Sequence, residues 1–268
     1  FKRLWDDGLI YRGERIVNYC TVHRTSFADI EVEHKNEQSK LWKVAYPSLD
    51  KISEIVVATT RPETMFGDVA IAVHPDDERY KALIGTRVML PLTDREITVI
   101  ADEYVDPAYG TGAVKITPAH APNDFEVGER HSLERRQVID FDGKMINTPT
   151  QFLGLDVDTA RKRTLGALQA AELLRGEDAI EHAVGHCYKC GSVIQPLIRD
   201  QWFLKVQPLA QRAKTALQNN EISFSPSSRA HVLEQYYDKL RDWNLSRQIP
   251  WGIPIPAFQN VNDPDDWI

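Results

Sequence analysis

Long apolar stretches are absent from the sequence. No run approaches the length of about eighteen apolar residues that suggests a membrane-spanning helix, and neither a secretory signal peptide nor a low-complexity tract is present. These absences predict a cytoplasmic protein without a membrane partner, and we expect a monomer. An initiating methionine is also missing, and residues 1–5 resemble the middle of an amphipathic helix, so we expect a piece of a longer chain.

Positive charge is scarce as well, since 32 Lys and Arg residues stand against 39 Asp and Glu residues, a net charge of −7. A domain that grips nucleic acid along a broad face needs clustered lysine and arginine. The composition therefore argues against that mode of binding, although a local contact to the end of a nucleic acid remains compatible with it. At 268 residues the chain can bury a proper core in one large or two modest domains.

Only three cysteines occur, and all of them stand in short motifs. Cys20 and His23 form C-x-x-H, and Cys187 and Cys190 form C-x-x-C. Two intervening residues let both side chains of a pair reach one ion, so the two motifs together supply a Cys3His set typical of structural zinc. The alternatives are two unrelated thiol pairs, a partly decayed site or a redox pair, and the redox pair is least favoured because no thioredoxin-like pattern surrounds it. His186 is the reserve ligand if His23 is not the fourth.

Residues 109–128 combine a glycine turn, an apolar strand, a lysine, a histidine and an acid. Val114 and Ile116 alternate with Lys115 and Thr117, which predicts a strand that sends the ammonium and the hydroxyl to one face. The proline that follows should end this strand. Such a composition indicates a site rather than a core.

A helix should follow, beginning near Phe125 and capped by Asn123 or Asp124, with Glu126 in its first turn. Polar groups would then gather where a strand end faces a helix N-terminus, a place that binds anions and amines well. A solvated turn with an ordinary cap is the alternative.

A second polar run, residues 59–68, follows a short apolar strand expected over residues 55–58. The proline after Arg61 favours an extended, stiff connection. Threonine hydroxyls donate and accept hydrogen bonds and arginine pairs with phosphate, so the run suits a polar substrate with a nucleic-acid end. A capping box formed by Thr60 and Glu63 is the alternative for part of the run.

Four segments together resemble the editing domain of valyl-tRNA synthetases: ATTRPETMFGD at 58–68, AIAVHPDDERY at 70–80, ADEYVD at 101–106 and GTGAVKITPAHAPNDFEVG at 110–128. Related isoleucyl and leucyl editing domains carry a different residue in place of Glu63 and lack the KITPAH sequence. The resemblance implies an α+β fold, with a mixed β-barrel-like editing core and flanking helices on a small zinc-stapled stem. It also implies that the two cysteine motifs, in entry and exit segments lying side by side, share one zinc.

The resemblance further implies post-transfer editing, in which water hydrolyses the ester of Thr-tRNA(Val), with the 3′ end of tRNA(Val) as the partner. Asp124 would anchor the substrate amino group, with Thr60 and Lys115 completing the catalytic set. No Ser-His-acid or Cys-His set occurs in these runs, and His120 fits an orienting role better than that of a general base. The hydrolysis needs no cofactor, and ATP would bind only in the full-length enzyme because the HIGH and KMSKS signatures are absent. The residues implied in substrate binding are Thr59, Arg61, Thr64, Tyr109 (stacking on adenine), Thr117 and His120.

Two departures from the family leave alternatives open. Ala121 stands where valyl editing domains usually carry aspartate, so a catalytically impaired module that only binds the tRNA 3′ end is one alternative. Ile253 and Pro254 follow a Trp-Gly pair in the manner of isoleucyl or leucyl relatives, so an editing domain of that type is another. A free-standing editing enzyme is disfavoured, because segments on both flanks also resemble synthetase.

The order of these features predicts four parts. They are an entry segment with the first cysteine motif (1–45), the editing domain (46–182), an exit segment with the second motif (183–225) and a return toward the synthetic catalytic domain (226–268). Within them we expect strands near 28–33 and over 69–73, 87–90 and 99–101, a helix over 157–174 and an amphipathic segment over 208–217.

Overall fold

The computed structural model describes residues 1–50 and 52–267 and divides into two compact units. The smaller unit comprises Phe1–Arg15 and Arg199–Ile268, and the larger unit comprises Ile16–Ile198. Helices and strands are mixed, which confirms the α+β class. The described strands form open sheets rather than a closed barrel, so the barrel-like core is not confirmed. Among the described helices, none has the length and apolar character that crossing a membrane requires.

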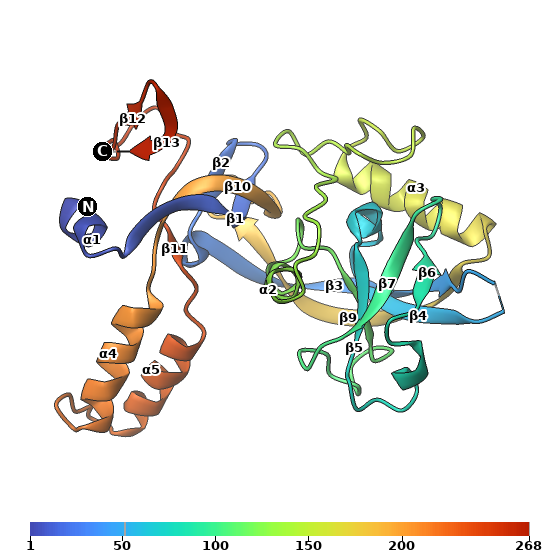
Figure 1. Ribbon diagram of the computed structural model, residues 1–268, viewed down its shortest axis with the longest axis horizontal. Coiled ribbons are helices and arrows are strands. Elements are labelled where there is room, and N and C mark those ends of the chain that lie inside the picture. Colours follow the sequence, from blue (N-terminus) through green and yellow to red (C-terminus); the bar gives the residue numbers. More distant parts are fainter. Residues whose placement is uncertain (51, 268) are drawn as a thin grey trace. The chain divides into compact units, whose positions relative to one another are not determined.

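The larger unit contains a three-stranded antiparallel sheet of order β4-β3-β9. Strands β3 (Val32–Pro47) and β9 (Leu174–Cys187) form a long two-stranded ribbon (Figure 1). Strand β4 (Glu54–Thr59) alternates buried with less buried side chains, as a strand with one core face should. Its last residue is the buried Thr59, so the polar run at 59–68 begins at the edge of the core.

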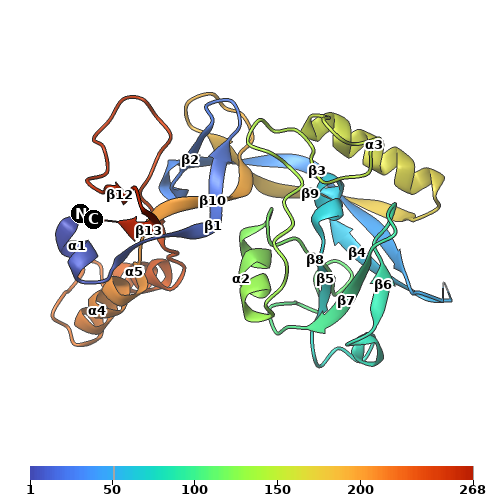
Figure 2. The ribbon, with the colours of Figure 1, turned by 45° about the horizontal axis from the view of Figure 1, so that its top comes forward.

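A mixed four-stranded sheet of order β6-β7-β5-β8 shares its core with the first sheet. Figure 2 shows β8 beside β5, with β7 and β6 beyond. Only β5 and β7 are parallel to each other. Strand β5 is buried along its whole length because apolar clusters cover both of its faces, which accounts for its unbroken apolar sequence. The strands are β5 (Ala70–Val73), β6 (Arg87–Met89), β7 (Glu96–Ala101) and β8 (Ala113–Ile116).

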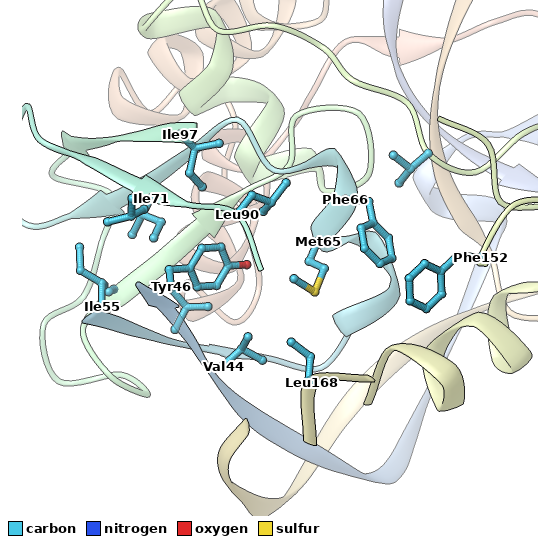
Figure 3. Close-up of a cluster of buried hydrophobic side chains, with 14 of the residues drawn as sticks. Val44, Tyr46, Ile55, Met65, Phe66, Ile71, Leu90, Ile97, Phe152 and Leu168 are labelled. Carbon is cyan, nitrogen blue, oxygen red and sulfur yellow. The ribbon is translucent and has the colours of Figure 1, made fainter. Parts of the chain in front are cut away.

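The main core is formed by these two sheets and helix α3 (Figure 3). Phe66 and Phe152 pack with their ring centroids 4.7 Å apart, and Met65 and Leu168 belong to the same cluster. Every residue of the 3-10 helix η2 (Pro62–Gly67) is buried. The second polar run is therefore fixed inside the larger unit and does not form a mobile surface loop.

Helix α3 (Val157–Ala170) begins as predicted, because the Asp156 side chain accepts a hydrogen bond from the backbone N–H of Thr159. It ends earlier than the predicted limit at residue 174, since Leu174 already starts β9. Glu172 turns the chain between the two elements with a φ of 55°.

Helix α2 (Pro122–Arg130) begins before the predicted start near Phe125. A proline suits the first helical position because the N–H it lacks would have no partner there. The predicted caps are therefore wrong: Ala121 occupies the N-cap position, and Asn123 and Asp124 lie inside the first turn.

The smaller unit holds an apolar cluster centred on Ile10, Trp202 and Leu204. Strands β1 (Ile10–Cys20) and β10 (Gln195–Leu204) contribute residues to both units. The amphipathic segment predicted over 208–217 is helix α4. The remaining elements of this unit are α1 (Lys2–Asp6), α4 (Gln207–Gln218), α5 (Ser228–Asp238), β11 (Trp243–Asn244), β12 (Gln259–Asn260) and β13 (Asp263–Trp267).

The strand predicted near residues 28–33 is wrong for most of its length. Strand β2 (Thr25–Phe27) ends before it, and a 3-10 turn, η1 (Asp29–Glu31), replaces it. The Glu31 carboxylate accepts a hydrogen bond from the Ala28 N–H at 2.8 Å, which holds the backbone in the turn until β3 begins. The strands predicted at 55–58, 69–73, 87–90 and 99–101 correspond to β4, β5, β6 and β7, and a further 3-10 turn is η3 (Lys81–Leu83).

Candidate functional site

Lys115 joins the two polar runs. It lies on β8, where the alternation at 114–117 predicted that it shares a face with Thr117, and the structure buries both side chains. Its Nζ donates to Thr64 Oγ1 and Asp68 Oδ1, each at 3.1 Å, and to Thr117 Oγ1. An ammonium has three hydrogens, so all of its donors are used. Lys115 therefore contributes a fixed positive charge to the site.

Asp68, which the sequence did not single out as a site residue, holds this lysine in place. Its Oδ1 accepts from both Lys115 and the Thr117 hydroxyl, and its Oδ2 accepts from the Tyr46 hydroxyl at 2.6 Å. Burial raises the pKa of Asp68 against the opposing charge of Lys115. The network buries one acid and one base together, with every carboxylate oxygen hydrogen-bonded.

Asp124 lies in the first turn of α2 and is only 7% exposed. Its Oδ2 accepts a hydrogen bond from the backbone N–H of Thr117 at 2.9 Å, whereas its Oδ1 has no partner among the described residues. Burial raises the pKa of Asp124 to about 6, although the charge of Lys115 and the Thr117 N–H oppose the shift. A buried carboxylate with one oxygen to spare is suited to a cation, such as an amino group.

Arg61 is held by three different partners at the start of η2. Its Nη1 donates to the carbonyl of His120 at 3.1 Å, its Nη2 to Gln195 Oε1 at 2.6 Å, and its Nε to Glu63 Oε1 at 3.3 Å. Its backbone N–H donates to Thr59 Oγ1 at 3.0 Å. The guanidinium thus connects the two polar runs to strand β10 by hydrogen bonds. No pattern in the local sequence around Arg61 predicts this connection.

The capping box considered for Thr60 and Glu63 does not form. The N-cap of η2 is Arg61, without a side-chain cap, and Glu63 instead accepts two hydrogen bonds of 2.9 Å from Arg161 on α3. Burial opposes ionisation of Glu63, but its bonds to Arg161 and the charge of Arg61 outweigh burial and lower its pKa. Glu63 is therefore a buried anion between two arginines.

His120 has both ring nitrogens engaged with backbone. Its Nε2 accepts from the Val138 N–H at 2.8 Å, which leaves the proton on Nδ1, 3.3 Å from the Pro196 carbonyl. Burial lowers the pKa of His120 to about 3. The ring is neutral and has no nitrogen left for a substrate, which favours the orienting role over the substrate-binding one.

Thr60 and Tyr109 remain at the margin of the site. Thr60 is half-buried at the end of β4, and Tyr109 is 59% exposed. Gly110, with a φ of 59°, turns so closely past β4 that a Cβ there would lie 3.2 Å from Ala58 Cβ. The turn that follows Tyr109 therefore passes next to the strand that leads into the polar run at 59–68.

The four predicted metal ligands come together in the larger unit. The ligand atoms of Cys20, His23, Cys187 and Cys190 all lie within 4.8 Å of one another. Cys20 Sγ is 3.7 Å from Cys190 Sγ, and His23 Nδ1 is 3.6 Å from both Cys20 Sγ and Cys187 Sγ. Tetrahedral zinc with bonds of about 2.3 Å to sulfur and about 2.0–2.1 Å to nitrogen requires separations of about 3.8 Å between two sulfurs and about 3.6 Å between sulfur and nitrogen. The cluster can therefore hold a metal such as zinc.

The reserve ligand His186 lies outside this set. Its Nδ1 is 2.9 Å from the Gly191 carbonyl and its Nε2 is 2.9 Å from Glu37. Within the set, burial opposes ionisation of Cys190, yet hydrogen bonds from Ser192 lower its pKa to about 6. A thiol that ionises readily suits metal binding, because the thiolate is the ligand.

The family model for "tRNA synthetases class I (I, L, M and V)" matches residues 1–266. The chain is 48% identical to the valine–tRNA ligase of Petrotoga mobilis over 98% of its own length and 30% of that protein. It is 49% identical to the valine–tRNA ligase of Pseudothermotoga lettingae, over 98% of its own length and 31% of that protein. It is also 49% identical to the valine–tRNA ligase of Carboxydothermus hydrogenoformans, over 96% of its own length and 29% of that protein.

The chain thus spans slightly under a third of the length of these relatives. Their names favour the valyl assignment over the isoleucyl or leucyl alternative that Ile253 and Pro254 raised. With the family model covering almost every residue, the chain belongs to the class I tRNA synthetases, on the valyl branch.

Proposed function

We propose that this chain hydrolyses the ester of Thr-tRNA(Val), the post-transfer editing reaction of a valyl-tRNA synthetase. The observation that carries the proposal is the buried Asp124 carboxylate, with one oxygen unpaired beside the Lys115 network. The partner would be the 3′ end of tRNA(Val), bound by a monomer in the cytoplasm. ATP would be bound only by the full-length enzyme.

The need for such a site follows from the limits of binding selectivity. A pocket shaped for valine rejects threonine only about a hundredfold, because the two side chains have nearly the same shape. A second pocket that hydrogen-bonds the threonine hydroxyl reverses the preference, since valine would leave buried polar groups unpaired at about 1–3 kcal/mol each. The hydroxyls of Thr59, Thr64 and Thr117 already have protein partners, so the half-buried hydroxyl of Thr60 would provide such a group.

Asp124 would receive the substrate ammonium on Oδ1 while Thr117 N–H holds Oδ2. The ammonium is a cation, so its arrival favours the ionised carboxylate despite the raised pKa. A water molecule would attack the ester carbon, oriented by the half-buried Thr60 hydroxyl. Lys115 would act through its charge on the developing oxyanion, because its three donors are already used.

The other residues would shape the pocket. Arg61 would hold the two polar runs together through its hydrogen bond to the His120 carbonyl. The His120 ring would keep that carbonyl in position through its bond to the Val138 N–H. Tyr109 would stack on the terminal adenine, a contact worth about 1–3 kcal/mol. Neither Arg61 nor His120 would change protonation during the reaction, since both are committed to protein partners.

We also propose that the Cys3His cluster binds structural zinc. The metal would hold Cys187 and Cys190 in place, a few residues before Gln195 and Pro196. Gln195 contacts Arg61, and Pro196 contacts His120. Zinc would then preserve the pocket without taking part in the hydrolysis. The editing domain would extend over 46–182, between entry and exit segments at 1–45 and 183–225, with 226–268 leading back to the synthetic domain.

A catalytically impaired tRNA-binding module is the second candidate, because Ala121 lacks the carboxylate usual at its position. The two candidates are separated by deacylation of Thr-tRNA(Val), with Val-tRNA(Val) and Ile-tRNA(Ile) as comparison substrates. Editing requires preferential hydrolysis of Thr-tRNA(Val), abolished by Asp124→Ala and retained by Glu126→Ala, an exposed acid of the same helix. An impaired module would bind the tRNA end without hydrolysis and would gain activity in Ala121→Asp. Undiminished hydrolysis in Asp124→Ala would refute the role given to that residue.

A further inference from the structure

A groove of about 700 Å³ lies outside the site described above. Phe66, at the far end of η2 from Arg61, forms part of its wall, together with segments around residues 92–95 and 147–149. Two arginines line it, Arg95 and Arg136. None of the residues assigned to editing lines this groove, so it needs its own explanation.

Arg136 has poorly satisfied donors. Its Nε is buried without a hydrogen-bond partner, and its Nη2 reaches the Asn147 carbonyl only at 3.4 Å. Its Nη1 lies 3.8 Å from Glu134, beyond hydrogen-bonding distance, and the Glu134 side chain is 63% exposed. A guanidinium has five donors in a planar fork, so most of the hydrogen-bonding capacity of Arg136 is unused.

Two further features point to a negatively charged ligand. The hydroxyl oxygen of Thr148, which also lines the groove, is buried without a partner. Arg95 donates hydrogen bonds to the Phe66 carbonyl at 2.8 Å and to the Asp68 carbonyl at 3.1 Å. Burial is the largest cause that lowers the pKa of Arg95, and the positive charge of the neighbouring Arg136 is the second. Among the described residues that line the groove, the exposed Asp94 is the one acid.

Two neighbouring guanidiniums and an unpaired hydroxyl need a ligand with several acceptor oxygens and negative charge. A phosphate meets that need, since it accepts paired hydrogen bonds from an arginine fork. We propose that this groove binds a phosphate group of the single-stranded 3′ end of a tRNA, with Arg136 and Thr148 as its contacts. The proposal rests on the proposed function only for the source of the phosphate.

The groove would also help to place the substrate. Arg95 binds the carbonyls of Phe66 and Asp68 at the end of the same buried turn that presents Thr64 to Lys115. A phosphate held there is anchored to the turn that forms one wall of the editing pocket. Its contribution would appear in substrate binding rather than in the hydrolytic step.

The test measures binding of a single-stranded RNA ending in CCA to the whole chain across a series of salt concentrations, and of inorganic phosphate in parallel. Arg136→Gln should weaken RNA binding at least about tenfold and reduce the salt slope by about 0.7, the value for one phosphate contact on a single strand. Thr148→Val should weaken it less. The matched control, Arg87→Gln, removes the same charge from a 64% exposed side chain outside the groove and should bind nearly as the unchanged chain does.

RNA binding unchanged in Arg136→Gln, or weakened equally in Arg87→Gln, would overturn the proposal. So would phosphate binding that depends on Arg136 while RNA binding does not, because the source of the phosphate would then be wrong. Deacylation measured on the same variants separates the two proposals. A chain that binds RNA through Arg136 but fails to hydrolyse Thr-tRNA(Val) refutes editing and supports the groove.

Discussion

Replacing Asp124 by asparagine should make the chain more stable at neutral pH while abolishing hydrolysis. Asparagine has nearly the same shape and retains an oxygen to accept the Thr117 N–H. It removes the charge that burial disfavours. The stability of the unchanged chain is thus reduced by a charge that the proposed reaction needs.

The magnitude follows from the pKa of Asp124, which burial raises from 3.8 to about 6. One pKa unit corresponds to about 1.36 kcal/mol, so the ionised carboxylate lowers the free energy of unfolding by about 3 kcal/mol. Between these two values the folded state binds more protons than the unfolded state, so stability falls as the pH rises. The loss is absent below 3.8 and complete above about 6.

The assay is urea denaturation of both proteins from about pH 3 to about pH 8. The free energy of unfolding of the Asp124→Asn variant should equal that of the unchanged chain at the acidic end and exceed it by about 2–3 kcal/mol above pH 6. Each kcal/mol corresponds to about 2–4 °C in Tm for a chain of this size. Glu126→Gln, on the exposed face of α2, should show no such divergence. A difference that does not vary with pH, or a variant less stable at neutral pH, would show that the carboxylate is favourably paired and would refute the reasoning.

Four further outcomes are expected. Glu63→Gln removes a buried anion from between two half-buried arginines and should lower the free energy of unfolding by about 3–5 kcal/mol, measured in urea. Lys115→Met leaves Asp68 without its cation and should destabilise the chain by a similar amount, on the order of 3 kcal/mol, and abolish deacylation; activity equal to that of the unchanged chain would exclude any role for its charge. Zinc removal by a chelator, or Cys187→Ser, should lower Tm and weaken substrate binding. Gln195→Ala should raise KM without changing the zinc content, which metal analysis would check.

Features encoded within a few residues were predictable from the sequence. The alternation at 114–117 placed Lys115 and Thr117 on the same face because side-chain direction in a strand depends only on parity, whereas the burial of that face was visible only in the structure. The two cysteine motifs were recognisable because spacing within each motif decides whether both side chains can reach one ion. The meeting of the two motifs across the chain came from the family resemblance.

Pairs between distant residues were not predictable in this way. Glu63 and Arg161 belong to η2 and α3, and Gln195 reaches Arg61 from β10. Nothing in the local sequence of Glu63 distinguishes a capping acid from a buried anion, because the difference depends on which side chain the fold brings opposite it. Asp68 was overlooked for the same reason, since its partners Tyr46 and Lys115 come from two different sheets.

Ala121 shows how position in the fold changes the meaning of a residue. From sequence alone it is a missing acid three residues before Asp124, which suggests impaired chemistry. In the structure it occupies the N-cap of α2, where an aspartate would accept the N–H of the second or third helical residue and add about 1 kcal/mol to stability. An aspartate in that cap would commit one oxygen to the helix backbone, as Asp124 commits Oδ2 to the Thr117 N–H, and the unpaired Oδ1 of Asp124 does not depend on it. The loss of the acid at residue 121 therefore changes the start of the helix, and the amino-group contact proposed above needs only the free oxygen of Asp124.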